Sequence, residues 1–250
     1  MIGKIYISKD GIQDYEGDGD RAMEKSDQIG TFPNLAGELV RGVELLDVIA
    51  QYKKYSDCET INVEIKTPGG LGEEGDKIYD YLNSLKEKHT VNTISTGDIG
   101  SIGTKIFLVG EKRIMGKGHE FFIHNPWTNP RPGDSNWFKN DAEDLKTEED
   151  KLMKFYLSAT DITEEGIKPL MDKETALTAE QAVTLGFATS TYEPIKVLAI
   201  LKNKNNKSEK MSKEDKSLLD KVKALIMGSD QEVKSLLVDL EGGSQVYVVT

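Results

Sequence analysis

The sequence predicts an α/β fold with mostly parallel strands. Segments that alternate apolar and polar residues, as strands do, take turns with segments whose apolar residues recur at helical spacing. The connections between these segments are short, and glycines and prolines mark several of them. Strands and amphipathic helices that alternate in this way are typical of parallel strands joined by helical crossovers.

The first hundred residues contain three predicted strands and two predicted helices. Residues 8–35 interrupt this pattern, because they are polar, contain several glycines and show no clear period, so we expect a long loop or an insertion there. The predicted elements are a strand over 2–7 (IGKIYI), a helix over 43–55, a strand over 61–66 (INVEIK), a helix that ends near Leu85 and a strand over 91–96 (VNTIST).

Further along the chain the signals are more mixed. Residues 97–110 (GDIGSIGTKIFLVG) contain an apolar run whose period does not separate a helix from a buried strand. Residues 119–124 (HEFFIH) indicate a strand, and a long helix is expected from about Asn136 to Tyr156. Thr178 and Gln181 have the spacing of a capping box, which predicts a short helix that ends before Gly186.

The composition changes after Ile200. Residues 199–211 are polar and basic without any period, so they are expected to form a linker. We therefore divide the chain into a main domain over residues 1–198, this linker, and a C-terminal extension over 212–250. The extension should contain a helix after Ser212 and a hairpin that turns at Gly242-Gly243. A segment of about 40 residues buries too little apolar surface to fold alone.

Composition and charge exclude several classes of protein. The chain has 32 basic and 43 acidic residues and a net charge of -11, which argues against a nucleic-acid surface. Cys58 is the only cysteine, so no intrachain disulfide or cysteine-based metal cluster can form. The three histidines lack the spacing of metal ligands. The first residues lack the apolar run of a signal peptide, and no segment has the length of a membrane span, so we expect a cytoplasmic protein without membrane contact.

Two glycine-containing segments carry candidate chemistry. Thr67-Pro68-Gly69-Gly70 lies between a predicted strand and a predicted helix, where backbone N–H groups can approach a ligand closely. Gly97-x-x-x-Ser101-x-Gly103 places a serine among small residues at a predicted turn. Such a serine is open to a substrate, and the N–H of the next residue can donate to an oxyanion. Either segment, taken alone, is more often a plain turn.

A third segment, Phe121-Phe122-Ile123-His124-Asn125-Pro126, ends a predicted strand in a histidine. A general base at this position would be held by the strand and could face a nucleophile. His119 is the alternative histidine, but its neighbours Lys117 and Gly118 indicate a solvated turn. His89 follows a charged helix end, where a cation would be favourable.

These segments occur in an order that resembles the Clp protease proteolytic subunit along most of residues 60–190. The matching motifs are TPGG, GDIGSIG, FIHNP and LTAEQAVTLG, and the serine and histidine lie 23 residues apart. The resemblance implies a ClpP/crotonase-type spiral of ββα units with a protruding helical handle, formed here by residues 136–156. It also implies a self-assembling serine peptidase, and a homo-oligomeric ring that acts on protein or peptide substrates.

The family's functional residues carry over onto positions of this chain. Ser101 matches the nucleophile and His124 the general base, while Gly70 and Ile102 match the residues whose N–H groups form the oxyanion hole. The acid departs from the family, because Glu174 stands where the resemblance places an aspartate. Asp172 is the alternative acid, and a dyad without a carboxylate stays open. The implied mechanism requires neither a metal nor an organic cofactor.

A narrower resemblance concerns the segment from Lys173 to Ala179 (KETALTA), which is similar to the head-maturation (prohead) proteases of tailed bacteriophages. It implies substrates among capsid and scaffold proteins, and a location in the host cytoplasm or the assembling capsid. The alternatives are a housekeeping ClpP-type protease with an ATPase partner, a catalytically silent ClpP-like assembly subunit, and a crotonase-like acyl-CoA enzyme. The sequence leaves the ATPase partner, the ring size and the cleavage specificity open.

Overall fold

The computed structural model describes residues 1–9, 25–33, 39–129, 131–196, 235–239 and 245–249. The chain divides into two compact units, Met1–Thr191 and Tyr192–Thr250, and each is described by itself. The predicted linker over 199–211 and the predicted helix after Ser212 lie outside the described residues. Among the helices that the structure describes, none is long and apolar enough to cross a membrane.

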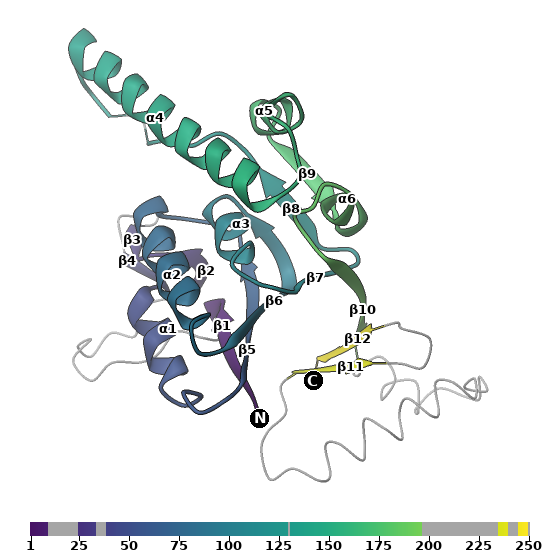
Figure 1. The fold of residues 1–250 in the computed structure, drawn as a ribbon. Coiled ribbons are helices and arrows are strands. Elements are labelled where there is room, and N and C mark those ends of the chain that lie inside the picture. The colour runs from purple at the N-terminus through teal and green to yellow at the C-terminus, as the bar shows by residue number, and fades with distance from the viewer. Residues whose placement is uncertain (10–24, 34–38, 130, 197–234, 240–244, 250) are drawn as a thin grey trace, which may run out of the picture. The chain divides into compact units, whose positions relative to one another are not determined.

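Parallel strands form the main sheet of the first unit, as the sequence predicts. Their order in the sheet is β1-β5-β6-β7, and Figure 1 shows them running through the middle of this unit. Branched apolar residues line these strands, and most of them are fully buried, as expected for a sheet covered on both faces. The strands are β1 (Ile2–Ile7), β5 (Thr60–Thr67), β6 (Thr90–Gly100) and β7 (Arg113–Gly116).

Strand β6 is longer than predicted, and it changes partners along its length. Its first half pairs with β7, with Thr93 opposite Arg113. Its end pairs with β8 (Glu120–Ile123), with Gly100 opposite Phe122, and both pairings are parallel. Strand β9 (Thr175–Thr178) then pairs antiparallel with β8. Because β6 and β8 run in the same direction, their carboxyl ends meet at one place in the fold.

The expectation of a loop over residues 8–35 is wrong in part. Two strands lie within this range, β2 (Lys25–Ile29) and β3 (Phe32–Pro33), and they form a small sheet with β4 (Leu39–Val43) in the order β2-β4-β3. The sequence hides β2 because its residues are mostly half-buried and only Ile29 is fully buried, so no apolar alternation marks it. Residues 10–24 lie outside the description.

Three helices follow one another along one side of the main sheet (Figure 1). They are α1 (Leu45–Tyr52), α2 (Gly72–Leu85) and α3 (Ile102–Phe107). The first two confirm the predicted helices, and α3 resolves the ambiguous run after residue 97, of which the first part extends β6. Helix α5 (Glu164–Asp172) has no counterpart in the prediction. The capping box is confirmed at α6 (Ala179–Thr184), where Thr178 and Gln181 exchange hydrogen bonds of 2.9 and 3.3 Å.

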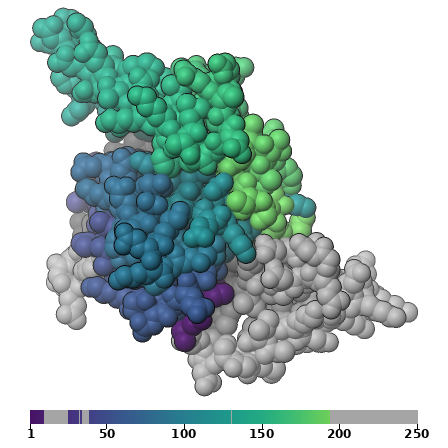
Figure 2. Space-filling model, viewed as in Figure 1, coloured from purple at the N-terminus to yellow at the C-terminus, as the bar shows by residue number. Residues whose placement is uncertain are grey.

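Helix α4 (Ser135–Ala159) is the predicted long helix and is slightly longer than expected. Asp134 caps it by accepting a hydrogen bond of 2.8 Å from the N–H of Trp137. Only Met153 and Tyr156 of this helix are buried, and both lie in its last turns. The first turns project beyond the rest of the unit, as Figures 1 and 2 show.

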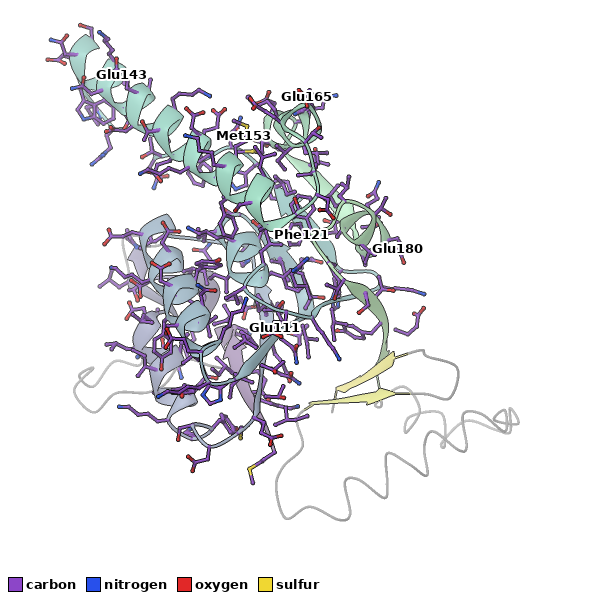
Figure 3. All side chains as sticks on the ribbon, viewed as in Figure 1. Glu111, Phe121, Glu143, Met153, Glu165 and Glu180 are labelled. Atoms are coloured by element: carbon purple, nitrogen blue, oxygen red, sulfur yellow. The ribbon has the colours of Figure 1, made fainter. Side chains whose placement is uncertain are left out.

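Aromatic rings fill the core between α4 and the end of the sheet. Phe121 is fully buried, with its ring centre 5.8 Å from that of Phe107 and 5.2 Å from that of Phe187. Tyr156 reaches the same cluster, 5.7 Å from Phe187. In Figure 3 Phe121 lies inside the unit, whereas Glu143 lies on the projecting part of α4. This aromatic cluster therefore connects β8, α3 and α4.

The second unit contains three strands within its described residues. Strand β10 (Ser190–Lys196) begins at the boundary and pairs in parallel with β12 (Gln245–Val249). Strand β11 (Ser235–Asp239) pairs antiparallel with β12. This antiparallel pair is consistent with the predicted hairpin, although its turn at Gly242-Gly243 lies outside the described residues.

Candidate active site

Ser101 occupies a one-residue turn between a strand and a helix. Strand β6 ends at Gly100 and α3 begins at Ile102, so Ser101 alone joins the two elements. Its backbone angles are φ 53° and ψ −130°, which lie in a region that residues other than glycine rarely adopt. Holding a serine there costs about 1–3 kcal/mol, and such strain concentrates at functional sites. A strained strand-to-helix turn also exposes the nucleophile of α/β-hydrolases, although this segment has Ile99 where their motif has its first glycine.

Hydrogen bonds on both sides hold this strained turn. The N–H of Ser101 donates to the carbonyl of Phe122 on β8 at 3.1 Å. The carbonyl of Ser101 accepts from the hydroxyl of Thr104 at 2.6 Å, and the Thr104 hydroxyl also lies 2.6 Å from that of Tyr156 on α4. Complete burial raises the pKa of Tyr156 to about 12, so its phenol stays protonated at neutral pH. The turn is thus tied to β8 and to α4.

The Thr67–Gly70 turn packs directly against Ser101. A Cβ atom on Gly69 would lie 2.3 Å from the Cβ of Ser101, and Gly69 has a φ of 104°. A Cβ atom on Gly103 would lie 2.4 Å from the side chain of Thr67. Both distances are below those of real contacts, so these two glycines are required for the close approach of the turn to the elbow.

The two candidate oxyanion donors, the N–H groups of Gly70 and Ile102, lie next to the contact between the turn and Ser101. The carbonyl of Gly69 and the N–H of Leu71 both bond to Ile29 of β2, at 2.8 and 2.9 Å. Since successive backbone groups of an extended segment point to opposite edges, the N–H of Gly70 points away from Ile29. It has no hydrogen-bond partner within the described residues. Ile102 is the first residue of α3, so its N–H has no partner within the helix.

His124 directly follows β8, one strand away from Ser101. Gly100 pairs with Phe122, so Ser101 and His124 both lie just beyond the paired ends of β6 and β8. His124 is 9% exposed, and its Nδ1 lies 2.6 Å from the carbonyl oxygen of Asn125. In the neutral ring this contact makes Nδ1 the protonated nitrogen and leaves Nε2 as an acceptor. The structure records no hydrogen bond between Ser101 and His124 in the described part of the chain.

The two candidate acids differ in their surroundings. On β8 and β9, Ile123 lies opposite Thr175, and one further step of this antiparallel register places His124 opposite Glu174. Glu174 has a φ of 50°, which makes it, with Ser101, one of the two non-glycine residues with positive φ in the described chain. Its side chain is exposed. No hydrogen bond from Glu174 to His124 is found among the described residues.

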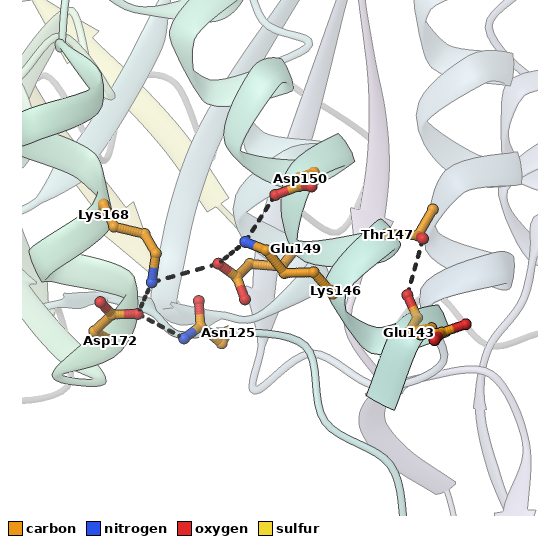
Figure 4. Close-up of polar contacts among 8 residues, drawn as sticks. All are labelled: Asn125, Glu143, Lys146, Thr147, Glu149, Asp150, Lys168 and Asp172. Atoms are coloured by element: carbon orange, nitrogen blue, oxygen red, sulfur yellow. Dashed lines mark hydrogen bonds and ion pairs between the residues drawn. The ribbon is translucent and has the colours of Figure 1, made fainter. Parts of the chain in front are cut away.

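Asp172 instead belongs to a chain of polar contacts (Figure 4). It pairs with Lys168 and accepts a hydrogen bond of 2.9 Å from the side-chain amide of Asn125. The hydrogen bond from Lys168, followed by that from Asn125, lowers the pKa of Asp172. Asp172 does not contact His124 directly in the described structure. It touches the residue that follows the histidine.

The other two histidines lie away from the elbow. Lys117 and Gly118 form an exposed turn, as expected, but His119 itself is half-buried, with Nδ1 2.9 Å from the hydroxyl of Ser95. Burial lowers its pKa. His89 is buried, and its ring nitrogens lie 2.6 Å from the carbonyl oxygen of Cys58 and 2.9 Å from the hydroxyl of Tyr52. It links α1 to the residues that follow α2, and it is buried rather than exposed. No group of potential metal-binding side chains converges in the described ranges.

Comparison with protein families decides which family the segment around this site belongs to. Residues 44–194, more than half of the chain, match the family described as Clp protease. The chain belongs to the Clp protease family. This match includes the Thr67–Gly70 turn, the Ser101 elbow, His124 and both candidate acids.

Curated Clp proteins resemble the chain at moderate identity. It is 27% identical over 128 residues to ATP-dependent Clp protease proteolytic subunit 2 of Gluconobacter oxydans, covering 50% of this chain and 57% of that protein. It is 29% identical over 133 residues to subunit 3 from Rhizobium etli, covering 52% and 67%. The proteolytic subunit of Paracoccus denitrificans is 30% identical over 130 residues, covering 51% and 64%. The aligned region thus spans about 57–67% of these relatives.

Sequence reasoning did not identify two features of this site. Thr104 and Tyr156 support the elbow, but they lie 52 residues apart and no local pattern joins them. Asn125 was read only as part of the FIHNP motif, although it contacts both His124 and Asp172. Its position between a candidate base and a proline was the available signal, because the residue before a proline is conformationally restricted.

Proposed function

We propose that this Clp-family chain is a serine-type endopeptidase in which Ser101 is the nucleophile and His124 the general base. Gly70 and Ile102 donate the two oxyanion hydrogen bonds. Glu174, opposite His124 in the β8–β9 register, is the carboxylate whose charge stabilises the imidazolium without a hydrogen bond to Nδ1, which the Asn125 carbonyl occupies; Asp172 is the alternative acid. The observation that carries this proposal is the strained elbow at Ser101, with φ 53° in a residue that is not glycine.

The proposed reaction proceeds through an acyl-enzyme. As Ser101 Oγ attacks the peptide carbonyl carbon, its proton passes to Nε2 of His124, and the developing oxyanion accepts from the Gly70 and Ile102 amides. The C–N bond then breaks as the imidazolium returns the proton to the leaving amine. A water molecule repeats the sequence on the ester and releases the second product. Each proton transferred to His124 is returned, and the steps require no metal or organic cofactor.

Hydrolysis of a fluorescently labelled casein tests this proposal. Ser101→Ala should lower the rate by several orders of magnitude, because loss of a triad serine leaves only binding and oxyanion effects. Ser84→Ala is the matched control, since Ser84 is exposed on α2 and its hydroxyl donates to the carbonyl of Tyr81. Equal activity of the two variants would refute the assignment of Ser101.

Two classes of protein substrate follow from two different resemblances. The resemblance of residues 173–179 to prohead proteases supports capsid and scaffold proteins as substrates, whereas the named ATP-dependent Clp relatives support a housekeeping protease that works with an ATPase. The two proposals differ in their requirement for ATP. Cleavage of a purified scaffold protein without any ATPase would support the first, and dependence on an ATP-driven partner would support the second.

A further inference from the structure

We propose that Asn125 is the positioning residue of His124: its main-chain carbonyl holds the imidazole, and Asp172 and Lys168 act on His124 only through its side chain. This inference rests on the proposed function for its catalytic meaning. Its structural content concerns the histidine alone and can be tested separately.

Asn125 makes one polar contact through its backbone and one through its side chain. Its carbonyl oxygen lies 2.6 Å from His124 Nδ1, and its side-chain Nδ2 donates to Oδ1 of Asp172 at 2.9 Å. Because a carboxylate can only accept, the amide of Asn125 must present its nitrogen to Asp172. The side-chain oxygen is buried and has no partner within the described residues. The orientation of the side chain is therefore determined by Asp172.

The backbone at this point depends on such a side-chain contact. Strand β8 ends at Ile123, so the strand ladder does not fix the carbonyl of Asn125. Pro126 restricts the backbone of Asn125 to extended conformations, which narrows the directions available to that carbonyl. The hydrogen bond to Asp172 selects one of them. The carbonyl can then accept the Nδ1 proton of His124 and keep Nε2 free for the proton of Ser101.

The contacts continue from Asp172 to the long helix α4 (Figure 4). Lys168 on α5 pairs with Asp172 and also lies 3.4 Å from a carboxylate oxygen of Glu149 on α4. Lys146 on the same helix lies 2.9 Å from Glu149. The side chains of Lys168 and Asp172 are 36% and 44% exposed, and ion pairs that exposed contribute little individually. The effect on His124 should therefore decrease with each step away from Asn125.

This arrangement assigns a role to Asp172 that differs from that of a catalytic acid. A triad acid bonds directly to the histidine and stabilises its charge. Asp172 instead bonds to the amide of Asn125, and its carboxylate is already paired with Lys168. Removing Asp172 should loosen the carbonyl that holds the imidazole. Once Asn125 has lost its side chain, the loss of Asp172 should have no further effect.

The first experiment measures how fast a fluorophosphonate probe labels the full-length protein. Asn125→Ala should slow labelling about 10-fold, Asp172→Ala about 3- to 10-fold and Lys168→Ala about 2-fold. The double variant Asn125→Ala/Asp172→Ala should label at the rate of Asn125→Ala alone. Asn136→Ala, an exposed asparagine on α4, is the matched control and should label normally. Multiplying effects in the double variant would show that Asp172 acts without Asn125 and would overturn the proposal.

The second experiment observes the histidine without any reaction. Nitrogen-15 NMR of the protein, with His124→Gln used for assignment, should show neutral His124 with its proton on Nδ1. Asn125→Ala should convert this single tautomer into a mixture, while His89 and His119 stay unchanged. A proton on Nε2 in the unmodified protein would overturn the proposal. Absence of labelling together with the expected tautomer would refute the peptidase assignment and leave the positioning role standing.

Discussion

Ser101 and Glu174 share a property that sets them apart at the scale of single residues. Both adopt a positive φ, of 53° and 50°, although neither is glycine. Both lie where a chain segment ends, Ser101 after β6 and Glu174 after α5, and the register of β8 with β9 places Glu174 opposite His124. Strain of this kind persists where the surrounding structure imposes it, which is common at functional sites.

Substitution of Glu174 by glycine should separate stability from activity. Glycine adopts a φ of 50° without strain, so Glu174→Gly should raise or preserve the free energy of unfolding, by up to about 1 kcal/mol. It should nevertheless slow casein hydrolysis. Urea unfolding and the hydrolysis assay on the same preparation test both effects. A variant that is clearly destabilised would contradict the strain argument.

Substitution by glutamine tests the charge of the same residue. Glu174→Gln keeps the size and the backbone strain but removes the carboxylate, so it should lower kcat about 10²-fold or more. Asp172→Asn should lower it less, since an asparagine oxygen can still accept the hydrogen bond from Asn125. If Asp172→Asn proved the more damaging change, Asp172 rather than Glu174 would be the third catalytic residue.

A short list of motifs named the candidate site residues, but the motifs could not predict the contacts between them. Ser101, His124 and the Thr67–Gly70 turn became candidates because glycines and a strand end leave local signals. The sequence ranks Glu174 ahead of Asp172 only through the family resemblance, because the register of β8 with β9 is a long-range property. The proposed role of Asn125 rests on an amide orientation that no spacing reveals.

At the scale of secondary-structure elements, a hydrogen bond joins α3 to α4. Tyr156 brings the buried end of α4 to Thr104 on α3, and Thr104 donates to the carbonyl of Ser101. The elbow is therefore supported by a helix that is distant in the sequence. Burial raises the pKa of Tyr156 to about 12, above its ordinary value of 10.0.

This pKa gives stability a defined pH dependence. In the unfolded chain Tyr156 ionises near pH 10, and in the folded protein it ionises only near pH 12. Its contribution to stability is therefore complete below pH 10 and is lost as the pH rises toward 12. Tyr156→Phe should lack this contribution. Urea unfolding from pH 8 to 11.5 should show the unmodified protein losing about 2 kcal/mol more than Tyr156→Phe over that range. Parallel curves would contradict the prediction.

The predicted elements were accurate where the apolar period was strong. Helices α1 and α2 and strands β1, β5 and β8 were found because each has a clear buried face, whereas α4 was found from apolar residues spaced along a charged segment and buries only Met153 and Tyr156. The sequence did not predict strand β2 or helix α5, for two different reasons. Residues of β2 are mostly polar and half-buried, and α5 is short, with a proline at position 169 that argues against a helix.

At the scale of the whole molecule, the projecting part of α4 bears on assembly. The Clp family relationship supports a homo-oligomeric ring, and we propose that the projecting part of α4 mediates contacts between copies. Phe138 lies there and is 52% exposed, beside Trp137 at 5.0 Å between ring centres. Burial of such rings between subunits would be favourable.

Phe138→Glu tests this proposal. The new charge would be buried in the interface, so the variant should shift from the oligomer toward smaller species in analytical ultracentrifugation. Ser84→Glu is the control for charge, because it adds the same single negative charge at an exposed position on α2, away from α4. An unchanged sedimentation profile for Phe138→Glu would exclude this surface as the contact.

The C-terminal extension gives a second prediction at this scale. We propose that residues 212–250 form a docking or scaffold-like module on a linker that the enzyme itself can cut, since exposed polar linkers are preferred cleavage sites. The concentrated active protein should be trimmed between about Ile200 and Lys213, and Ser101→Ala should stay intact, as mass spectrometry would show. Full-length active protein, together with an insoluble 1–200 truncation, would instead indicate that the extension covers an apolar surface.

Labelling of Ser101 tests the central claim most directly. Intact-mass and peptide mass spectrometry after treatment with a fluorophosphonate should show one adduct, located on Ser101. His124→Ala should abolish the adduct by removing the base, and Ser84→Ala should leave it unchanged. Absence of an adduct on folded protein, or an adduct on another serine, would contradict the assignment of Ser101 and His124 as the catalytic pair.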